Sequence, residues 1–154
     1  MQTKEQKKIW RQWADTLEFG GLKQVQGALC GVSRNEQGEP QLRYCCLGVL
    51  CAMHNAATAP KQNNWGPISE VSSSVVEDLE IGITYDGAPS LPPNTVRSWA
   101  GFDSKKYDTP LDFASLNDGT GLVFKEIAAV IRECVKQDTQ DVSRVARKLF
   151  PNHY

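Results

Sequence analysis

The sequence has no long apolar run. No stretch approaches the roughly 20 consecutive apolar residues that a membrane-spanning helix needs. The first six residues, Met1 to Gln6, also lack the apolar segment of a signal peptide. We therefore expect a cytoplasmic protein that has no membrane partner.

The sequence also lacks a charge excess of either sign. Its 154 residues hold 17 Lys and Arg against 18 Asp and Glu, which gives a formal net charge of −1. A protein that binds DNA through its phosphates needs a basic surface, and a DNA mimic needs a far larger negative charge, so we expect neither. The balance varies along the chain, because residues 57–118 hold nine acidic and only four basic side chains.

Histidine is scarce and cysteine is odd in number, which limits metal and nucleophile chemistry. Adjacent cysteines do not readily pair with each other, and a free cysteine is among the most commonly buried residue types, so we expect reduced thiols in the core. Zinc sites usually show two pairs of closely spaced ligands. Only one such pair, Cys51 and His54, is present, so we expect no metal and no cofactor. A zinc site or a cysteine nucleophile stays open as an alternative at Cys45, Cys46, Cys51 and His54.

Apolar residues recur at helical spacing in several segments. These patterns predict helices at residues 3–19, 45–57, 94–101, 122–135 and 139–150. The tryptophans of the first segment, Trp10 and Trp13, share one apolar stripe with Leu17, so we expect them in the core. Glycine follows the first helix and ends the third, as is typical of helix C-termini.

The remaining apolar segments are typical of strands and turns. Residues 22–44 predict a β-hairpin with a loose tip, residues 58–74 an irregular loop, residues 75–85 a strand before the turn Asp86-Gly87, and residues 111–116 another short strand. We expect an α+β fold, with amphipathic helices packed on a small antiparallel sheet. Residues 1–154 would form a single domain, in which 58–90 is a loop-rich insert and 137–154 a C-terminal helix and tail.

The turn Asn117-Asp118-Gly119-Thr120-Gly121 precedes a predicted helix. Free backbone N–H groups at a helix N-terminus can hold an anion, so Asn117 and Asp118 are candidate binding residues. The segment lacks the Lys-Ser/Thr pair of a phosphate-binding P-loop. Asn and Asp also cap helices or stabilise turns, and this alternative stays open.

Three segments together carry a resemblance. They are Tyr44-Cys45-Cys46-Leu47-Gly48-Val49-Leu50-Cys51, then Leu91-Pro92-Pro93 with Val96 and Trp99-Ala100-Gly101, and then Leu116-Asn117-Asp118 with Gly121, Phe124, Glu126-Ile127-Ala128 and Ile131. In these segments the chain resembles a group of small uncharacterised proteins of tailed bacteriophages and, more distantly, an actinobacterial family of unknown function. The resemblance implies a phage or prophage origin and supplies no catalytic residues.

Three functions follow as hypotheses. The first is a non-enzymatic accessory protein that binds and inhibits a host bacterial protein, for example a defence component, through the acidic middle segment, the long loop and Trp65. The second is a protein that binds and sequesters a small nucleotide signal with Arg43, Arg97 and the turn at Asn117 and Asp118. The third, a zinc- or cysteine-dependent enzyme, has the least support because no orienting partner for His54 can be identified.

Overall fold

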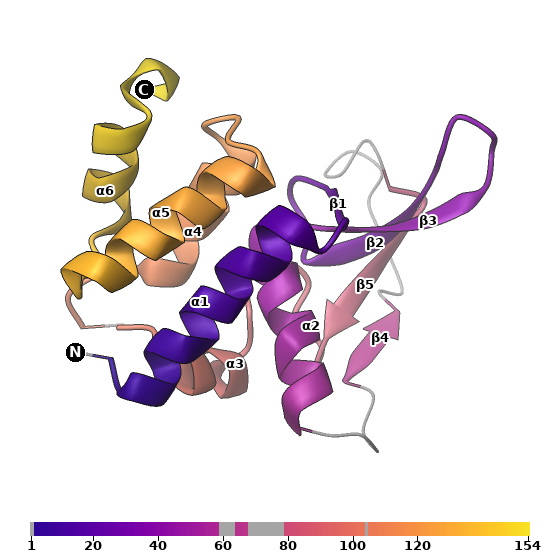
Figure 1. Cartoon of the computed structure of the whole chain (residues 1–154). Coiled ribbons are helices and arrows are strands. Elements are labelled where there is room, and N and C mark those ends of the chain that lie inside the picture. Colours follow the sequence, from indigo (N-terminus) through magenta and orange to yellow (C-terminus); the bar gives the residue numbers. More distant parts are fainter. Residues whose placement is uncertain (1, 59–63, 68–78, 104) are drawn as a thin grey trace.

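The longest helices form one side of the molecule. The computed structural model describes residues 2–58, 64–67, 79–103 and 105–154. In it, α1 (Lys4–Phe19) packs along α5 (Phe124–Gln137), and α6 (Val142–Leu149) lies beyond α5 (Figure 1). A capping box starts α1, because Thr3 Oγ1 accepts from the Gln6 amide and Gln6 Oε1 accepts from the Thr3 amide. The helices predicted from periodicity at both ends of the chain are confirmed.

The core forms around the two tryptophans of α1. Trp10 and Trp13 are fully buried, and each indole N–H donates at 2.8 Å to a backbone carbonyl, that of Ala100 and that of Cys46 respectively. Both rings lie edge-to-face against Phe113, with centroid distances of 5.6 and 4.7 Å. The tryptophans therefore serve the interior, as the helical stripe predicts.

Helix α2 (Cys46–Thr58) connects this core to the sheet. Its first six residues are buried, as expected for a short helix surrounded by the fold. A Cβ atom at Gly48 would lie 1.7 Å from the Leu29 carbonyl oxygen, so only glycine allows the helix to approach this backbone so closely.

Five short strands form a sheet in the order β1-β3-β2-β5-β4. The strands are β1 (Lys23–Gln24), β2 (Cys30–Arg34), β3 (Pro40–Tyr44), β4 (Trp65–Pro67) and β5 (Ile81–Tyr85). The neighbours pair antiparallel except β1 and β3, which are parallel, so the expected antiparallel sheet carries one parallel edge. The hairpin β2–β3 projects away from the helices (Figure 1). The predicted turn at Asp86-Gly87 is confirmed, with positive φ angles of 47° and 79°.

The strand predicted at 111–116 is wrong. These residues belong to helix α4 (Thr109–Asp118), which has Pro110 in its first turn. Phe113 and Leu116 are buried whereas Leu111 is 50% exposed, so the apolar positions follow helical rather than strand spacing. Asn117 and Asp118 accordingly end a helix, whereas we expected them in a loop.

Two further predictions need adjustment. Trp65 lies in strand β4 and not in an irregular loop, because it pairs with Tyr85 of β5. Of the strand expected at 75–85, the structure shows only the second half as a strand, β5 at Ile81–Tyr85. Residues 75–78 lie outside the described residues. Helix α3 (Asn94–Ala100) follows Pro93 and ends at Gly101, whose φ is 71°, as predicted.

The fold class is α+β, as the sequence predicts. Among the residues that the structure describes, none of the helices has the length and the apolar character needed to cross a membrane.

Candidate functional site

Asn117 lies in the interior, where it joins three segments. Its Oδ1 accepts from Gln24 Nε2 at 2.9 Å and from the Cys46 amide at 3.1 Å. Its Nδ2 donates to the Val25 carbonyl and to Asp118 Oδ1, both at 2.8 Å. The Cys46 amide is one of the N–H groups that a helix leaves unpaired at its start, so Asn117 caps α2 from the end of α4.

Asp118 completes this connection. Its Oδ1 also accepts from the Gly27 amide at 3.0 Å, and Gln26 Nε2 donates to the Asn117 carbonyl at 3.2 Å. The pair therefore holds the segment between β1 and β2 against the helices. Of the two interpretations left open by the sequence, the hydrogen bonds of Asn117 and Asp118 follow the capping interpretation.

The thiols are buried and protonated. All five cysteines are free and buried. Burial raises the pKa of Cys30 to about 11 and that of Cys45 to about 12, and it raises the pKa of Cys51 further still. A thiol that stays protonated at neutral pH is a poor nucleophile. In the described ranges, no group of three or more His, Cys, Asp and Glu side chains could hold a metal ion.

His54 pairs with a tyrosine and not with a thiol. Its Nδ1 lies 2.6 Å from Tyr85 Oη, and Asn64 Nδ2 donates to the same oxygen at 3.0 Å. Burial lowers the pKa of His54 and raises that of Tyr85, which keeps both groups neutral at pH 7. Between Tyr85 Oη and His54 Nδ1 the donor is set by the imidazole tautomer: with the ring proton on Nε2, the hydroxyl donates to Nδ1.

The strand register places apolar side chains on one face of the sheet. Val32 is paired with Leu42 on one side and with Ile81 on the other, and Cys30 is paired in the same way with Tyr44 and Ile83. Directly paired residues share a face, and so do residues two apart in a strand. We call this set the apolar sheet surface; it consists of Val32, Leu42, Tyr44, Trp65, Ile81 and Ile83.

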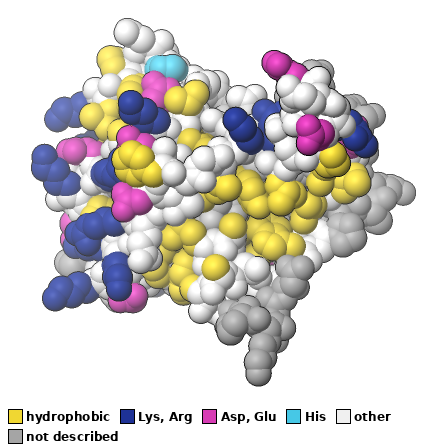
Figure 2. All heavy atoms as spheres, turned by 45° about the vertical axis from the view of Figure 1, so that its right-hand side comes forward, with side chains coloured by type: hydrophobic (Ala, Val, Ile, Leu, Met, Phe, Trp, Pro, Cys, Tyr) yellow, Lys and Arg dark blue, Asp and Glu magenta, His cyan; other side chains and the backbone are white. Residues whose placement is uncertain are grey.

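Only part of this face is covered by the helices. Tyr85 and Cys30 are fully or almost fully buried, whereas Leu42 and Ile81 are each 50% exposed, with Val32 partly exposed between them. The exposed row lies where the hairpin extends beyond the helices. Figure 2 turns the sheet side forward and shows hydrophobic side chains gathered in a band on this face, with charged side chains mainly on the helical side and near the hairpin.

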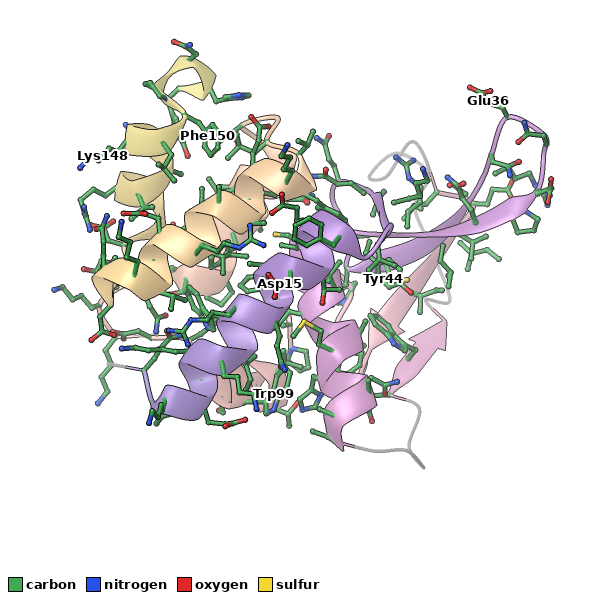
Figure 3. The ribbon with its side chains drawn as sticks, in the orientation of Figure 1. Asp15, Glu36, Tyr44, Trp99, Lys148 and Phe150 are labelled. Carbon is green, nitrogen blue, oxygen red and sulfur yellow. The ribbon has the colours of Figure 1, made fainter. Side chains whose placement is uncertain are left out.

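Aromatic residues border the apolar sheet surface on the helical side. Trp65 is half-buried, with its ring 4.7 Å from that of Tyr85 and 6.2 Å from that of Tyr44, both edge-to-face. Tyr44 lies where the sheet meets the helices, and Glu36 lies at the far tip of the hairpin (Figure 3). Trp65, which the first hypothesis placed at the contact, therefore belongs to this surface, whereas residues 68–74 of the predicted long loop lie outside the described residues.

The residues of the expected nucleotide site come from three elements, β3, α3 and the end of α4. Arg43 lies in β3 next to Gly31 and Lys23. Arg97 lies in α3, where its Nε donates to the Pro92 carbonyl at 2.7 Å, and it lines a cavity near the start of α4. Asn117 lies at the opposite end of α4. Sequence spacing gave no signal for these positions, since they depend on how the helices and strands pack.

No curated protein and no solved structure matches the chain closely enough to show a relationship. A family model described as a domain of unknown function (DUF8296) matches residues 5–135, and the chain belongs to this family.

Proposed function

We propose that the protein is a non-enzymatic accessory protein of a phage or prophage that binds a host bacterial protein and blocks it, for example a defence component. The contact is made by the apolar sheet surface. One observation carries this proposal: Leu42, Val32 and Ile81 form a cross-strand row in which both outer side chains remain half exposed.

A partner that covers this row would gain stability from apolar burial. Removing apolar area from water is worth about 25 cal/mol per Å², and contiguous exposed apolar patches on soluble proteins often mark interaction sites. The row also has the aromatic residues Tyr44 and Trp65 beside it. Aromatic residues are enriched among the few that dominate binding energy in protein interfaces.

The charges around the surface indicate what the partner must offer. Arg34 forms an ion pair with Glu80 at 2.8 Å and also donates to the Gly38 carbonyl. The hairpin tip also carries the exposed carboxylates of Glu36 and Glu39. We therefore expect a partner with an apolar centre and basic side chains opposite the hairpin tip.

This surface differs from the one that composition suggests. The acidic segment 57–118 and its long loop lie partly outside the described residues, whereas β2 and β3 belong to residues 1–56, which hold seven basic and five acidic side chains. Trp65, Ile81 and Ile83 are common to both surfaces. The buried, protonated thiols and the neutral His54–Tyr85 pair support a binding protein over a cysteine enzyme.

The test uses two variants whose substituted leucines are equally exposed. Leu42 and Leu111 are each 50% exposed, but only Leu42 lies on the apolar sheet surface. A host protein captured from bacterial lysate is identified and purified, and its affinity is then measured for the unmodified protein, Leu42→Gln and Leu111→Gln. We expect Leu42→Gln to weaken binding about tenfold or more, and Leu111→Gln to leave it unchanged.

Equal affinities for both variants would contradict the proposal. Sedimentation measures the oligomeric state of the unmodified protein, which gives a second test of the proposal. If the protein is a dimer that Leu42→Gln converts to a monomer, the apolar sheet surface is covered by a second copy of the chain and not by a host protein.

A further inference from the structure

A solvent-open cavity lies between α3 and the start of α4. It encloses about 480 Å³, which falls within the usual range for small-molecule sites. Its walls come from one side of α3, from the loop that follows and from the first turn of α4. The lining residues are Asn94, Arg97, Ser98, Phe102, Lys105, Lys106, Tyr107, Asp108 and Pro110.

The charge of this cavity is opposite to that of the chain segment around it. Arg97, Lys105 and Lys106 line it against a single carboxylate, that of Asp108. Residues 57–118 hold only four basic side chains, and the fold brings three of them to this one cavity. Such a concentration of cations favours an anionic ligand, and guanidinium and ammonium groups are the usual partners of phosphate oxygens.

Hydrogen bonds order the described residues on either side of the two lysines. Asp103 Oδ1 accepts from the Lys105 and Lys106 amides at 2.8 and 3.2 Å. Gln140 is buried and holds the start of the loop: its Nε2 donates to the Gly101 carbonyl at 2.7 Å, and its Oε1 accepts from the Asp103 amide at 2.8 Å.

Gln140 also reaches the start of α4, because its Oε1 accepts from Thr109 Oγ1 at 2.9 Å. The backbone that carries the cations is thus arranged before any ligand binds, which lowers the entropy lost on binding.

Aromatic rings form part of the wall beside the cations. Tyr107 and Phe102 both line the cavity, and Lys106 Nζ lies 5.3 Å from the centroid of the Tyr107 ring. Base–aromatic stacking typically contributes to binding with little dependence on which base is bound. A ligand with a phosphate group and a flat ring would use both features.

We propose that this cavity binds a mononucleotide. The phosphate contacts Arg97, Lys105 and Lys106, and the base lies against Tyr107. This site uses neither Arg43 nor Asn117, and it lies on other elements than the apolar sheet surface. The proposal of a nucleotide site is therefore independent of the proposed protein partner.

The experiment is a calorimetric titration of the full chain with AMP, GMP and UMP, with the matching nucleosides and inorganic phosphate as separate probes. We expect the monophosphates to bind more tightly than either inorganic phosphate or the nucleosides. The double variant Lys105→Gln/Lys106→Gln should weaken nucleotide binding about tenfold or more, because charge-assisted hydrogen bonds to phosphate are lost. Lys125→Gln, which changes an exposed lysine of α5, should leave it unchanged.

Tyr107→Leu separates the two parts of the ligand. It should weaken binding of the nucleotides and leave that of inorganic phosphate unchanged. Absence of binding by all three monophosphates, equal affinity for inorganic phosphate, or insensitivity to the double lysine variant would each overturn the proposal. Amide chemical shifts of the unmodified protein provide a second readout, because a bound nucleotide must change the shifts of the amides near the cavity, in residues 94–110.

Discussion

The helical side and the sheet side of this molecule use the same apolar residue types in different ways. Around α1 and α5 the large side chains, such as Trp13, Ile127 and Ile131, are fully buried. On the sheet, Leu42 and Ile81 are in register with one another across β2, yet half of each is exposed. The first set stabilises the fold, whereas the second adds little to it and forms the surface that we propose a partner covers.

The largest effect should come from the helical side. We expect Trp13→Ala to lower the free energy of unfolding by about 3–5 kcal/mol, since the change removes a buried ring and leaves a cavity beside Phe113. Denaturant unfolding followed by circular dichroism measures it. A loss below about 1 kcal/mol would show that the described core is not the main source of stability.

The next effect concerns the connection between the two sides. Asn117→Ala leaves the Cys46 amide and the Val25 carbonyl without their partner inside the protein. Each unsatisfied buried group costs about 1–3 kcal/mol, so we expect a loss of about 3 kcal/mol in the same unfolding assay. Asn152→Ala, in the exposed tail, is the control and should change stability by less than about 0.5 kcal/mol. Similar values for the two variants would contradict the capping role.

A smaller, pH-dependent effect belongs to His54. Burial lowers its folded-state pKa below the ordinary value of about 6.5, so the unfolded chain takes up a proton at higher pH than the folded protein. Its contribution to stability is therefore complete above about pH 6.5 and decreases as the pH falls below that value. We expect His54→Gln to flatten the decrease in unfolding free energy between pH 7 and pH 5.5.

Asp86 lies close enough to oppose part of this pKa shift of His54, so Asp86→Asn should make the decrease steeper. The control for His54→Gln is Asn152→Ala, which changes a residue of the exposed tail that does not titrate. It should leave the pH dependence of stability as it is in the unmodified protein. If the unfolding free energy of His54→Gln fell with pH as steeply as that of the unmodified protein, the protonation of His54 would not be linked to unfolding.

The smallest effect on stability should come from the sheet side. Leu42→Gln and Leu111→Gln replace equally exposed leucines, so we expect both to lower the unfolding free energy by less than about 1 kcal/mol. Thermal unfolding of the two variants checks this. If Leu42→Gln cost several kcal/mol more than Leu111→Gln, the apolar sheet surface would belong to the folding core and would not be available to a partner.

Sequence periodicity located the helices and the core better than it located the surfaces. The stripe of Trp10, Trp13 and Leu17 repeats often enough to identify both the helix and its buried face. Residues 111–116 span fewer than two helical turns, so helical and strand spacing could not be distinguished there. The alternation in β3 shows that Leu42 and Tyr44 share a face, but only the packing of the fold shows that Tyr44 is partly buried and Leu42 half exposed.

The candidate sites depended on tertiary packing even more. Asn117 lies two residues before Gly119 in a glycine-containing segment, which is typical of a turn. Its capping of α2 becomes visible only when residues 24–27, 46 and 117 are brought together. Arg97 was identified from the sequence, but its companions Lys105 and Lys106 were not. They line the same cavity as Arg97 because Gln140 binds the Gly101 carbonyl and the Asp103 amide, which holds the chain after α3 close to that helix.

Hydrogen–deuterium exchange of the protein with and without its captured host partner tests the central claim most directly. If the partner covers the apolar sheet surface, amide protection should increase in β2, β3 and β5, while the amides of α5 exchange as in the free protein. Protection confined to α5 and α6, with the hairpin unchanged, would contradict it.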